Sequence, residues 1–176
     1  MKFKKKSLRI PIGFSAGILF IWRAKPSLVS FIIGTLFIFF GELIRFVSSG
    51  TLKKFEGVTR NGIYAYTRNP LYIGSFFLGA GACIMSKDPL FSVVFFVFFI
   101  ILYSRVILRE EKYLVGRYGE DYVRYLGEVS RIFPRKLNLK YIFRETSPAL
   151  AIKNKEGKTL LGITFVLLIM IVKIIY

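Results

Sequence analysis

The sequence predicts an all-α, polytopic membrane protein with about five transmembrane helices. Hydrophobic residues make up 54% of the 176 residues, and the mean hydropathy is +0.53. Charged residues are nearly absent from several long runs and crowd into the segments between them, as in membrane-spanning proteins. The excess of basic residues, 27 Lys and Arg against 10 Asp and Glu, lies mainly in alternate connections, which the positive-inside rule predicts.

The first apolar run, residues 10–22, follows a basic N-terminal segment. At about 1.5 Å per residue it extends roughly 20 Å, less than the ~30 Å hydrocarbon core, so whether it crosses the whole bilayer stays open. A basic segment before a short apolar run is also typical of a signal peptide, but Arg23 and Lys25 follow where a small-residue cleavage site would be needed. We expect a retained helix, extended by Ser7 and Leu8, with Trp22 at the membrane interface.

Three further runs are expected to span the membrane before the large polar region. Residues 27–47 are interrupted only by Glu42 and Arg45, which form either an interfacial ion pair or a functional site. Residues 71–85 and 89–108 follow, joined by a minimal turn. In the first of these two, small residues recur every four positions and permit close helix packing: Ser75, Gly79 and Cys83.

A polar region, predicted to be helical and cytoplasmic, separates the fourth span from a last span at 159–176. Basic residues gather before the first span, before the third and between residues 105 and 158, so the N-terminus is predicted to be cytoplasmic and the C-terminus on the opposite side. A chain of this length is expected to form a single domain, residues 1–176.

The composition excludes several classes of chemistry. The net charge of +17 would suggest nucleic-acid binding in a soluble protein, but the basic residues here flank apolar spans, so we expect membrane lipids and no nucleic acid as partners. The chain has no histidine and a single cysteine, Cys83. Histidine-containing metal sites, Ser-His-Asp triads and Cys-His pairs are therefore ruled out, and no metal is expected. Carboxylates, Tyr, Arg, Asn, backbone groups or a cofactor must perform any catalysis.

Two dense stretches of polar and aromatic residues carry the candidate chemistry. The first runs from Gly62 to Gly74, where Asn69 is placed to cap a helix that begins at Pro70. The second begins at Glu110 and Glu111, at the end of a membrane helix. Neighbouring helical residues point about 100° apart, so one carboxylate can face a ligand while the other pairs with an arginine.

Together the two stretches resemble the isoprenylcysteine carboxyl methyltransferase and phospholipid methyltransferase family of integral membrane enzymes. The similarity covers roughly residues 55–135 and both stretches, in order. The first carries the pattern through Gly62, Tyr64, Arg68, Asn69, Pro70, Tyr72 and Gly74. The second carries it through Glu110, Glu111, Leu114, Tyr118, Gly119, Tyr122, Tyr125, Val129, Arg131 and Pro134.

The resemblance implies a cofactor, S-adenosylmethionine, bound at the cytoplasmic membrane surface. It places cofactor contacts at Val58, Thr59, Tyr64, Asn69, Pro70, Leu71, Tyr72, Glu110 and Glu111. It also implies an arginine on the substrate side just before the glutamate pair, for which Arg105 and Arg109 are both candidates. The implied substrate is a prenylated or otherwise lipid-like small molecule.

One departure from the family pattern affects the expected reaction. Asn69 stands where the family usually has histidine, and asparagine does not titrate near neutral pH. A carboxylate nucleophile needs no general base, so the sequence favours carboxyl O-methylation of an isoprenylcysteine-like or lipid-like acceptor. The alternatives are a phospholipid N-methyltransferase, a membrane sterol-type reductase and a non-catalytic membrane scaffold.

Overall fold

The computed structural model describes residues 9–53, 56–134 and 137–176. The basic residues before Arg9, the expected extension through Ser7 and Leu8, and Lys54 lie outside the described residues. Eight α-helices and one 3₁₀ turn follow one another in the described part: α1 (Arg9–Arg23), α2 (Leu28–Thr51), η1 (Gly62–Ala65), α3 (Pro70–Ser86), α4 (Pro89–Tyr118), α5 (Glu120–Glu128), α6 (Leu139–Arg144), α7 (Pro148–Lys153) and α8 (Glu156–Ile175).

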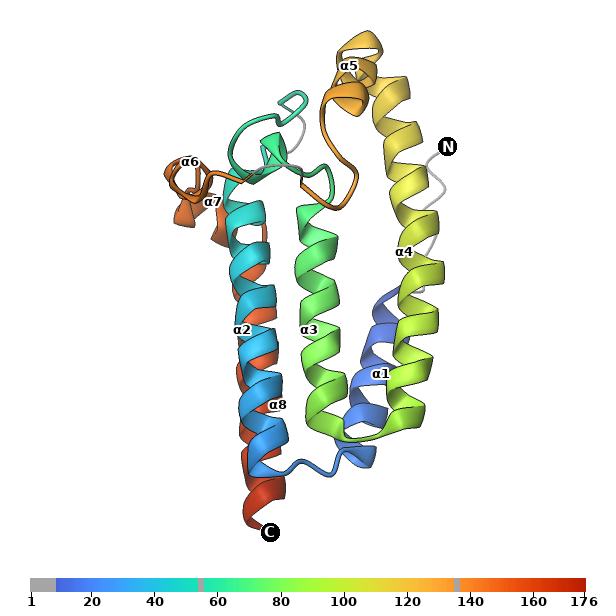
Figure 1. Cartoon of the computed structure of the whole chain (residues 1–176), viewed down its shortest axis with the longest axis vertical. Coiled ribbons are helices and arrows are strands. Elements are labelled where there is room, and N and C mark those ends of the chain that lie inside the picture. The colour runs from blue at the N-terminus through green and yellow to red at the C-terminus, as the bar shows by residue number, and fades with distance from the viewer. Residues whose placement is uncertain (1–8, 54–55, 135–136) are drawn as a thin grey trace.

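The long helices form a bundle whose connections alternate between its two ends, short at one end and long at the other (Figure 1). The α1–α2 and α3–α4 connections lie at one end, and η1, α5, α6 and α7 lie at the other. Among the described residues, α2, α4 and α8 are long and apolar enough to cross a membrane, whereas α3 is a shorter apolar helix of 17 residues. The all-α membrane class is therefore confirmed, while about five spans and the orientation remain predictions.

The predicted spans correspond closely to helices, and each difference has a local cause. Helix α2 continues to Thr51, beyond the predicted end at Val47, because its last turn is buried. Helix α4 continues without a break beyond the apolar span to Tyr118, where Gly119 adopts a positive φ of 56° and the chain turns into α5. Both chemistry-bearing stretches consequently lie at the same end of the bundle (Figure 1).

Four glycines allow the backbones of α2 and α3 to approach closely. A Cβ atom on Gly34 would lie 2.7 Å from the Gly81 carbonyl oxygen, and one on Gly41 would lie 2.7 Å from the Gly74 carbonyl oxygen. Contacts below 3.0 Å are essentially unknown for real Cβ atoms, so no larger residue fits without separating the helices. The small face predicted from Ser75, Gly79 and Cys83 makes other contacts: the Phe95 ring of α4 lies directly against Gly79.

A buried polar network attaches α8 to the α2–α3 pair. The Arg45 Nε atom donates to Glu156 Oε1 at 2.7 Å, and its Nη1 atom donates to Ser75 Oγ at 2.6 Å. The second Glu156 oxygen accepts from Ser49 Oγ at 2.7 Å. The sequence-based pair of Arg45 with Glu42 is longer, at 3.9 Å, so the main partner of Arg45 is on the last helix.

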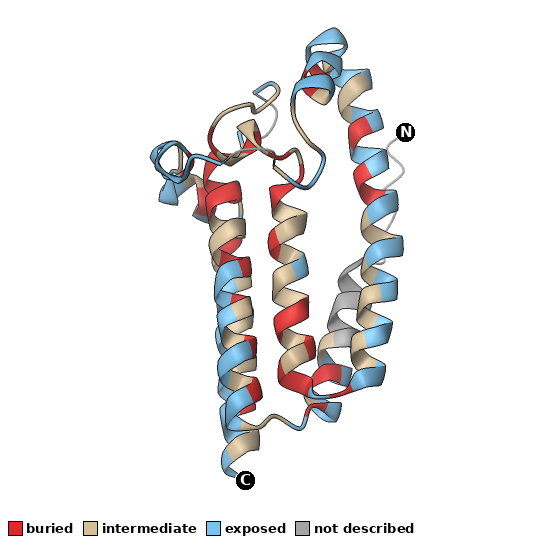
Figure 2. Cartoon of the chain, viewed as in Figure 1, coloured by how far each residue is buried: buried red, intermediate tan, exposed pale blue. Residues whose placement is uncertain are grey.

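The outer faces of the bundle are apolar and exposed. Buried residues concentrate in α2 and α3, whereas α4 and α8 present mostly exposed residues (Figure 2). Exposed large apolar side chains run along α2, α4 and α8, for example Phe39, Phe98 and Phe165. A water-soluble protein rarely exposes contiguous apolar surface on this scale, so lipid chains are the expected surroundings of these helices.

The close approach of α2 and α3 predicts a position-specific effect of glycine substitution. Gly34→Ala should lower the free energy of unfolding by about 1–3 kcal/mol, because the new methyl group would overlap the Gly81 carbonyl. The matched control is Gly162→Ala in α8, where nothing lies within 4 Å and the better helix propensity of alanine should leave stability unchanged or slightly higher. Thermal unfolding of the detergent-purified variants measures both. Equal stability of Gly34→Ala and wild type would contradict the packing described.

Candidate functional site

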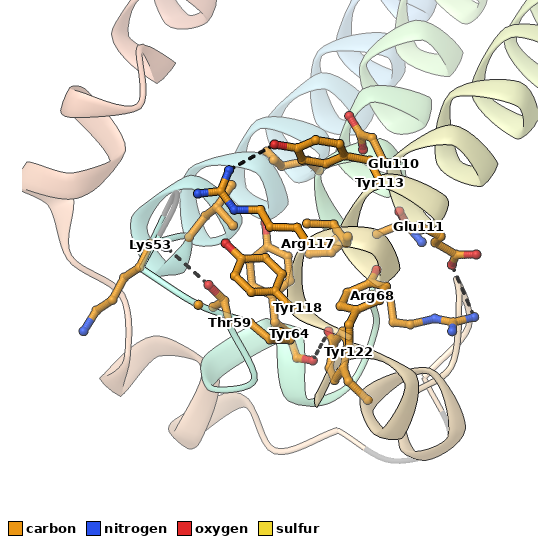
Figure 3. A pocket seen from close by; sticks show the side chains of 18 of the residues that line it. Lys53, Thr59, Tyr64, Arg68, Glu110, Glu111, Tyr113, Arg117, Tyr118 and Tyr122 are labelled. Atoms are coloured by element: carbon orange, nitrogen blue, oxygen red, sulfur yellow. Dashed lines mark hydrogen bonds and ion pairs between the residues drawn. The ribbon is translucent and has the colours of Figure 1, made fainter. Parts of the chain in front are cut away.

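The two stretches predicted to carry chemistry enclose a cavity of about 410 Å³ at the α5 end of the bundle (Figure 3). Its walls come from the segment after α2, from η1, from the start of α3, from the last turns of α4, and from α5. The lining residues are Leu52, Lys53, Gly57, Val58, Thr59, Tyr64, Arg68, Asn69, Pro70, Leu71, Tyr72, Glu110, Glu111, Tyr113, Leu114, Arg117, Tyr118, Tyr122 and Tyr125.

All nine residues predicted to contact a cofactor line this one cavity. They are Val58, Thr59, Tyr64, Asn69, Pro70, Leu71, Tyr72, Glu110 and Glu111. The candidate substrate-side arginines, Arg105 and Arg109, do not line it, and both are exposed on α4. The part of α4 that lines the cavity begins at Glu110, so both arginines lie before it, on the side of the membrane span. A role for either of them toward a substrate stays a prediction.

Tyr72 and Glu110 form a hydrogen-bonded pair at the cavity wall. The Tyr72 hydroxyl donates to Glu110 Oε2 at 2.6 Å, which joins the first turn of α3 to α4. The Tyr72 ring also packs edge-on against Tyr103, with ring centroids 5.0 Å apart. Glu110 is exposed, so its carboxylate remains accessible to a ligand that carries a positive charge or hydroxyl groups.

Glu111 has a different role from its neighbour, because it is buried between two arginines. Arg131 donates from Nη2 to Glu111 Oε2 at 2.7 Å and from Nε to Oε1 at 3.2 Å. Arg68 Nη2 lies 3.4 Å from Glu111 Oε1. The prediction that one glutamate faces the cavity while the other pairs with arginine fits this geometry, but the arginines are Arg68 and Arg131, which come from other parts of the chain.

Asn69 does not cap α3 through its side chain, which corrects the sequence-based prediction. Its φ and ψ are −126° and 49°, and its side chain makes no capping hydrogen bond. The Asn69 Nδ2 atom instead donates to the Arg131 carbonyl at 3.0 Å. The helix does begin at Pro70, and the Asn69 carbonyl accepts from the Tyr72 and Ile73 amides. The long-range hydrogen bond replaces the local one because residues 129–131 return alongside this segment.

Residues 129–131 are held against the first stretch by backbone and side-chain hydrogen bonds. Thr67 and Ser130 form an isolated parallel bridge, in which the Arg68 amide donates to the Ser130 carbonyl at 3.0 Å. Arg68 Nη1 also donates to the Leu126 carbonyl at 3.2 Å. The end of α5 and the loop after it therefore cover the segment that leads into α3.

Three tyrosines form the base of the cavity and remain protonated. The Tyr125 hydroxyl donates to the Tyr64 carbonyl at 2.8 Å, which ties α5 to η1. Burial is the main cause that raises the pKa of Tyr122 to about 12, and it also raises the pKa of Tyr64 and Tyr125 above the usual range. These phenols are therefore hydrogen-bond donors near neutral pH and do not act as general bases.

Several lining residues were not assigned a role from the sequence. Tyr122 and Tyr125 belong to the second family pattern, but nothing in the pattern showed that they would close the cavity. Arg117 was missed although it follows Glu110 and Tyr113 at helical spacing, which was the available signal. Its Nη1 atom donates to the Tyr113 hydroxyl at 3.0 Å, and its guanidinium lies 5.5 Å from the Tyr118 ring centroid. Figure 3 shows Arg117 between these two tyrosines.

The different surroundings of the two glutamates predict different effects on stability. Glu111→Gln should lower the free energy of unfolding by about 1–3 kcal/mol, because the largely buried side chain of Arg68 and the half-exposed side chain of Arg131 would lose their charged partner. Glu110→Gln is the matched control and should change stability by less than about 0.5 kcal/mol, since Glu110 is exposed. Thermal unfolding in detergent compares the stabilities of the two variants with that of the wild type. A larger loss in Glu110→Gln than in Glu111→Gln would contradict the assignment.

Comparisons with known proteins give one family and several relatives. The family model described as phospholipid methyltransferase matches residues 29–121. The protein-S-isoprenylcysteine O-methyltransferase of Saccharomyces cerevisiae is 31% identical over 72 residues, which cover 41% of this chain and 30% of the relative. The enzyme of the same name from Schizosaccharomyces pombe is 32% identical over 98 residues, covering 53% and 40%. That from Dictyostelium discoideum is 29% identical over 123 residues, covering 61% and 52%.

The matched region contains most of the candidate site. Residues 29–121 include the whole Gly62–Gly74 stretch, both glutamates and Arg117. The chain spans about a third to a half of the length of these curated relatives. No solved structure matches the chain significantly. Because the family model covers more than half of the chain and takes in most walls of the cavity, this protein belongs to the phospholipid methyltransferase family.

Proposed function

We propose that the protein is an S-adenosylmethionine-dependent methyltransferase of the membrane. The favoured reaction is methylation of the carboxylate of an isoprenylcysteine-like or lipid-like acceptor. One observation carries the proposal: nine residues assigned to the cofactor by family resemblance, separated by up to 53 positions in the chain, line the same cavity. The names of the relatives, protein-S-isoprenylcysteine O-methyltransferases, support the choice of acceptor.

The cavity suits the cofactor in size and in chemical groups. Its volume of about 410 Å³ falls within the range of roughly 300–1,000 Å³ that small-molecule sites occupy. Glu110 and Tyr72 would hold the ammonium group or the ribose hydroxyls of the cofactor, and the tyrosine rings would pack against its adenine base. For the carboxylate, two positive features are available: the start of α3 and the Arg117 guanidinium.

The residues of the chain would position the reactants and exclude water. When bound, S-adenosylmethionine supplies an activated methyl group. Holding two reactants in line can lower a barrier by roughly 7–11 kcal/mol without acid–base chemistry. The lining residues suit this task, because the buried tyrosines stay protonated and Asn69 is held by the Arg131 carbonyl. A carboxylate acceptor, which needs no deprotonation, fits such a site best.

A second cavity supports an apolar acceptor. It measures about 510 Å³, and its lining is almost entirely apolar: Leu19, Arg23, Ser75, Leu90, Phe91, Val94, Phe95, Phe98, Phe99, Leu102 and Tyr103. Tyr103 lines this cavity and packs against Tyr72, which lines the first. An apolar chain lying along α4 would therefore reach the candidate cofactor site at the Tyr72–Tyr103 contact.

The alternative is N-methylation of a phospholipid headgroup, which the description of the matching family model favours. An amine acceptor must lose a proton before it attacks, and Glu110 is the accessible carboxylate that could take it. In either case we propose that the first cavity faces the cytoplasm, as the distribution of basic residues predicts, with the C-terminus on the opposite side.

Cofactor binding tests the first part of the proposal. Isothermal titration of S-adenosylhomocysteine into detergent-purified protein should give saturable binding. Glu110→Gln and Arg117→Gln should each weaken it about tenfold or more, because each removes a charge-assisted hydrogen bond. The exposed Arg124→Gln, outside the cavity, is the control and should bind as the wild type does. For 5′-methylthioadenosine, which lacks the amino acid moiety, the affinities of Arg117→Gln and wild type should be equal. A folded wild type that does not bind would contradict the proposal.

The linkage of the transferred methyl group distinguishes the two reactions. Protein in liposomes is supplied with cofactor labelled in the methyl group and with either N-acetyl-S-farnesylcysteine or phosphatidylethanolamine. Carboxyl methylation should label the farnesylcysteine, and mild alkali should release that label as volatile methanol because esters hydrolyse. Alkali-stable label in phosphatidylethanolamine would instead establish the N-methyltransferase.

A further inference from the structure

The segment between α5 and α8 exposes large apolar and basic side chains outside the long helices. Three apolar residues are 49–68% exposed: Leu139, Phe143 and Ile152. Three basic residues alternate with them and are also exposed: Lys140, Arg144 and Lys153. We refer to these six residues as the α6–α7 surface. Neither cavity includes any of them.

The α6–α7 surface belongs to a firmly attached part of the fold. The Ser147 amide donates to the Gly50 carbonyl at 2.9 Å, and the Asn154 Nδ2 atom donates to the carbonyls of Ser49 and Leu52 at 2.8 and 2.9 Å. These bonds satisfy carbonyls at the C-terminal end of α2. Ile142 and Ala151 on the inner sides of α6 and α7 are buried. The apolar residues on the outer side are therefore held in place and exposed.

The attachment to α2 sets the depth of this surface relative to a bilayer. With 24 residues at about 1.5 Å each, α2 is roughly 36 Å long, somewhat longer than the ~30 Å hydrocarbon core. Its last turn therefore reaches the headgroup layer, and α7 is bonded to that turn. Figure 1 shows α6 and α7 at the side of α2 away from α3 and α4, and not stacked beyond the end of the bundle as α5 is.

We infer that the α6–α7 surface lies in the membrane interface and binds anionic phospholipids. Apolar and aromatic side chains flanked by lysine and arginine are the composition of segments that lie in this layer, with apolar groups among the upper acyl chains and cations at the phosphates. The three cations complement anionic headgroups, and the acidic residue of residues 137–155, Glu145, is half-buried and accepts from Asn61. The occupant is thus a patch of the bilayer rather than a protein partner.

The same segment is connected to a wall of the first cavity. Glu145 accepts from Asn61 Nδ2 at 3.0 Å, and the Tyr141 ring packs edge-on against Tyr66, with centroids 6.3 Å apart. Asn61 and Tyr66 flank η1, which carries the cavity residue Tyr64. Insertion of the surface into the interface would therefore hold η1 at a constant height above the bilayer.

Tryptophan fluorescence in nanodiscs tests the inference independently of any methyltransferase activity. The native tryptophan, Trp22, is removed by Trp22→Phe, and a single reporter is introduced by Phe143→Trp. The matched control reporter is Val123→Trp, at an apolar residue of similar exposure on α5, which lies beyond the end of the bundle (Figure 1). Nanodiscs contain phosphatidylcholine with or without phosphatidylglycerol, and a lipid brominated near the top of its acyl chains serves as quencher.

The Phe143→Trp reporter should be quenched about twofold or more relative to Val123→Trp, because only the former reaches the acyl chains. Phosphatidylglycerol should increase its quenching and blue shift. The effect of phosphatidylglycerol should be lost in a triple variant that combines Lys140→Gln, Arg144→Gln and Lys153→Gln. It should persist in a control variant that combines Lys25→Gln and Lys87→Gln, at the opposite end of the bundle. Equal quenching of the two reporters would overturn interfacial insertion. Quenching without any effect of phosphatidylglycerol or of the three substitutions would overturn anionic lipid binding.

Discussion

The candidate site depends on one buried carboxylate. Glu111 accepts hydrogen bonds from Arg131 and lies next to Arg68, so it joins α4, the loop after α5 and the segment before α3. Each of these three segments supplies walls or supports of the cavity. Buried charges are costly unless paired and hydrogen-bonded, and here the carboxylate is shared by two guanidinium groups. This ionic contact adds to the hydrogen bonds that hold residues 129–131 against Thr67 and Asn69.

The adjacent glutamates divide the work because a helix points consecutive side chains in different directions. Glu111 turns toward the protein and stabilises the site, whereas Glu110 stays exposed and bonds to Tyr72. A single glutamate could not fill both roles, since a carboxylate whose charge is neutralised by two arginines attracts a cationic ligand only weakly. This division also explains why Arg68 and Arg131, although basic and near the cavity, are structural partners, while Arg117, which donates to the Tyr113 hydroxyl, is the arginine that we propose contacts the cofactor carboxylate.

The bundle places this site where water and lipid meet. The glycine contacts between α2 and α3 bring the segments that flank both helices together at one end, and α4 extends past the apolar span to provide the opposite wall. Exposed apolar side chains along the long helices favour lipid surroundings, while the long connections gather at one end of the bundle. Under the proposed function, a water-soluble cofactor and an apolar acceptor would approach the same point from different phases, through two cavities that meet at Tyr72 and Tyr103.

The sequence by itself determined the helical membrane class, the approximate bounds of the long helices and nine of the residues around the candidate cofactor site. These follow from local properties: apolar run length, the helix start at Pro70, and a motif pattern in two short stretches. The pairing of Arg45 with Glu156, the hydrogen bond of Asn69 to Arg131 and the position of Arg117 were decided only by the tertiary structure. The two hydrogen bonds join residues that are far apart in the chain. The position of Arg117 depends on which side of α4 faces the cavity. Spacing along one helix predicts partners within one turn, such as Glu42 for Arg45. In the folded chain, Glu156, which is 111 residues away, lies closer to Arg45 than Glu42 does.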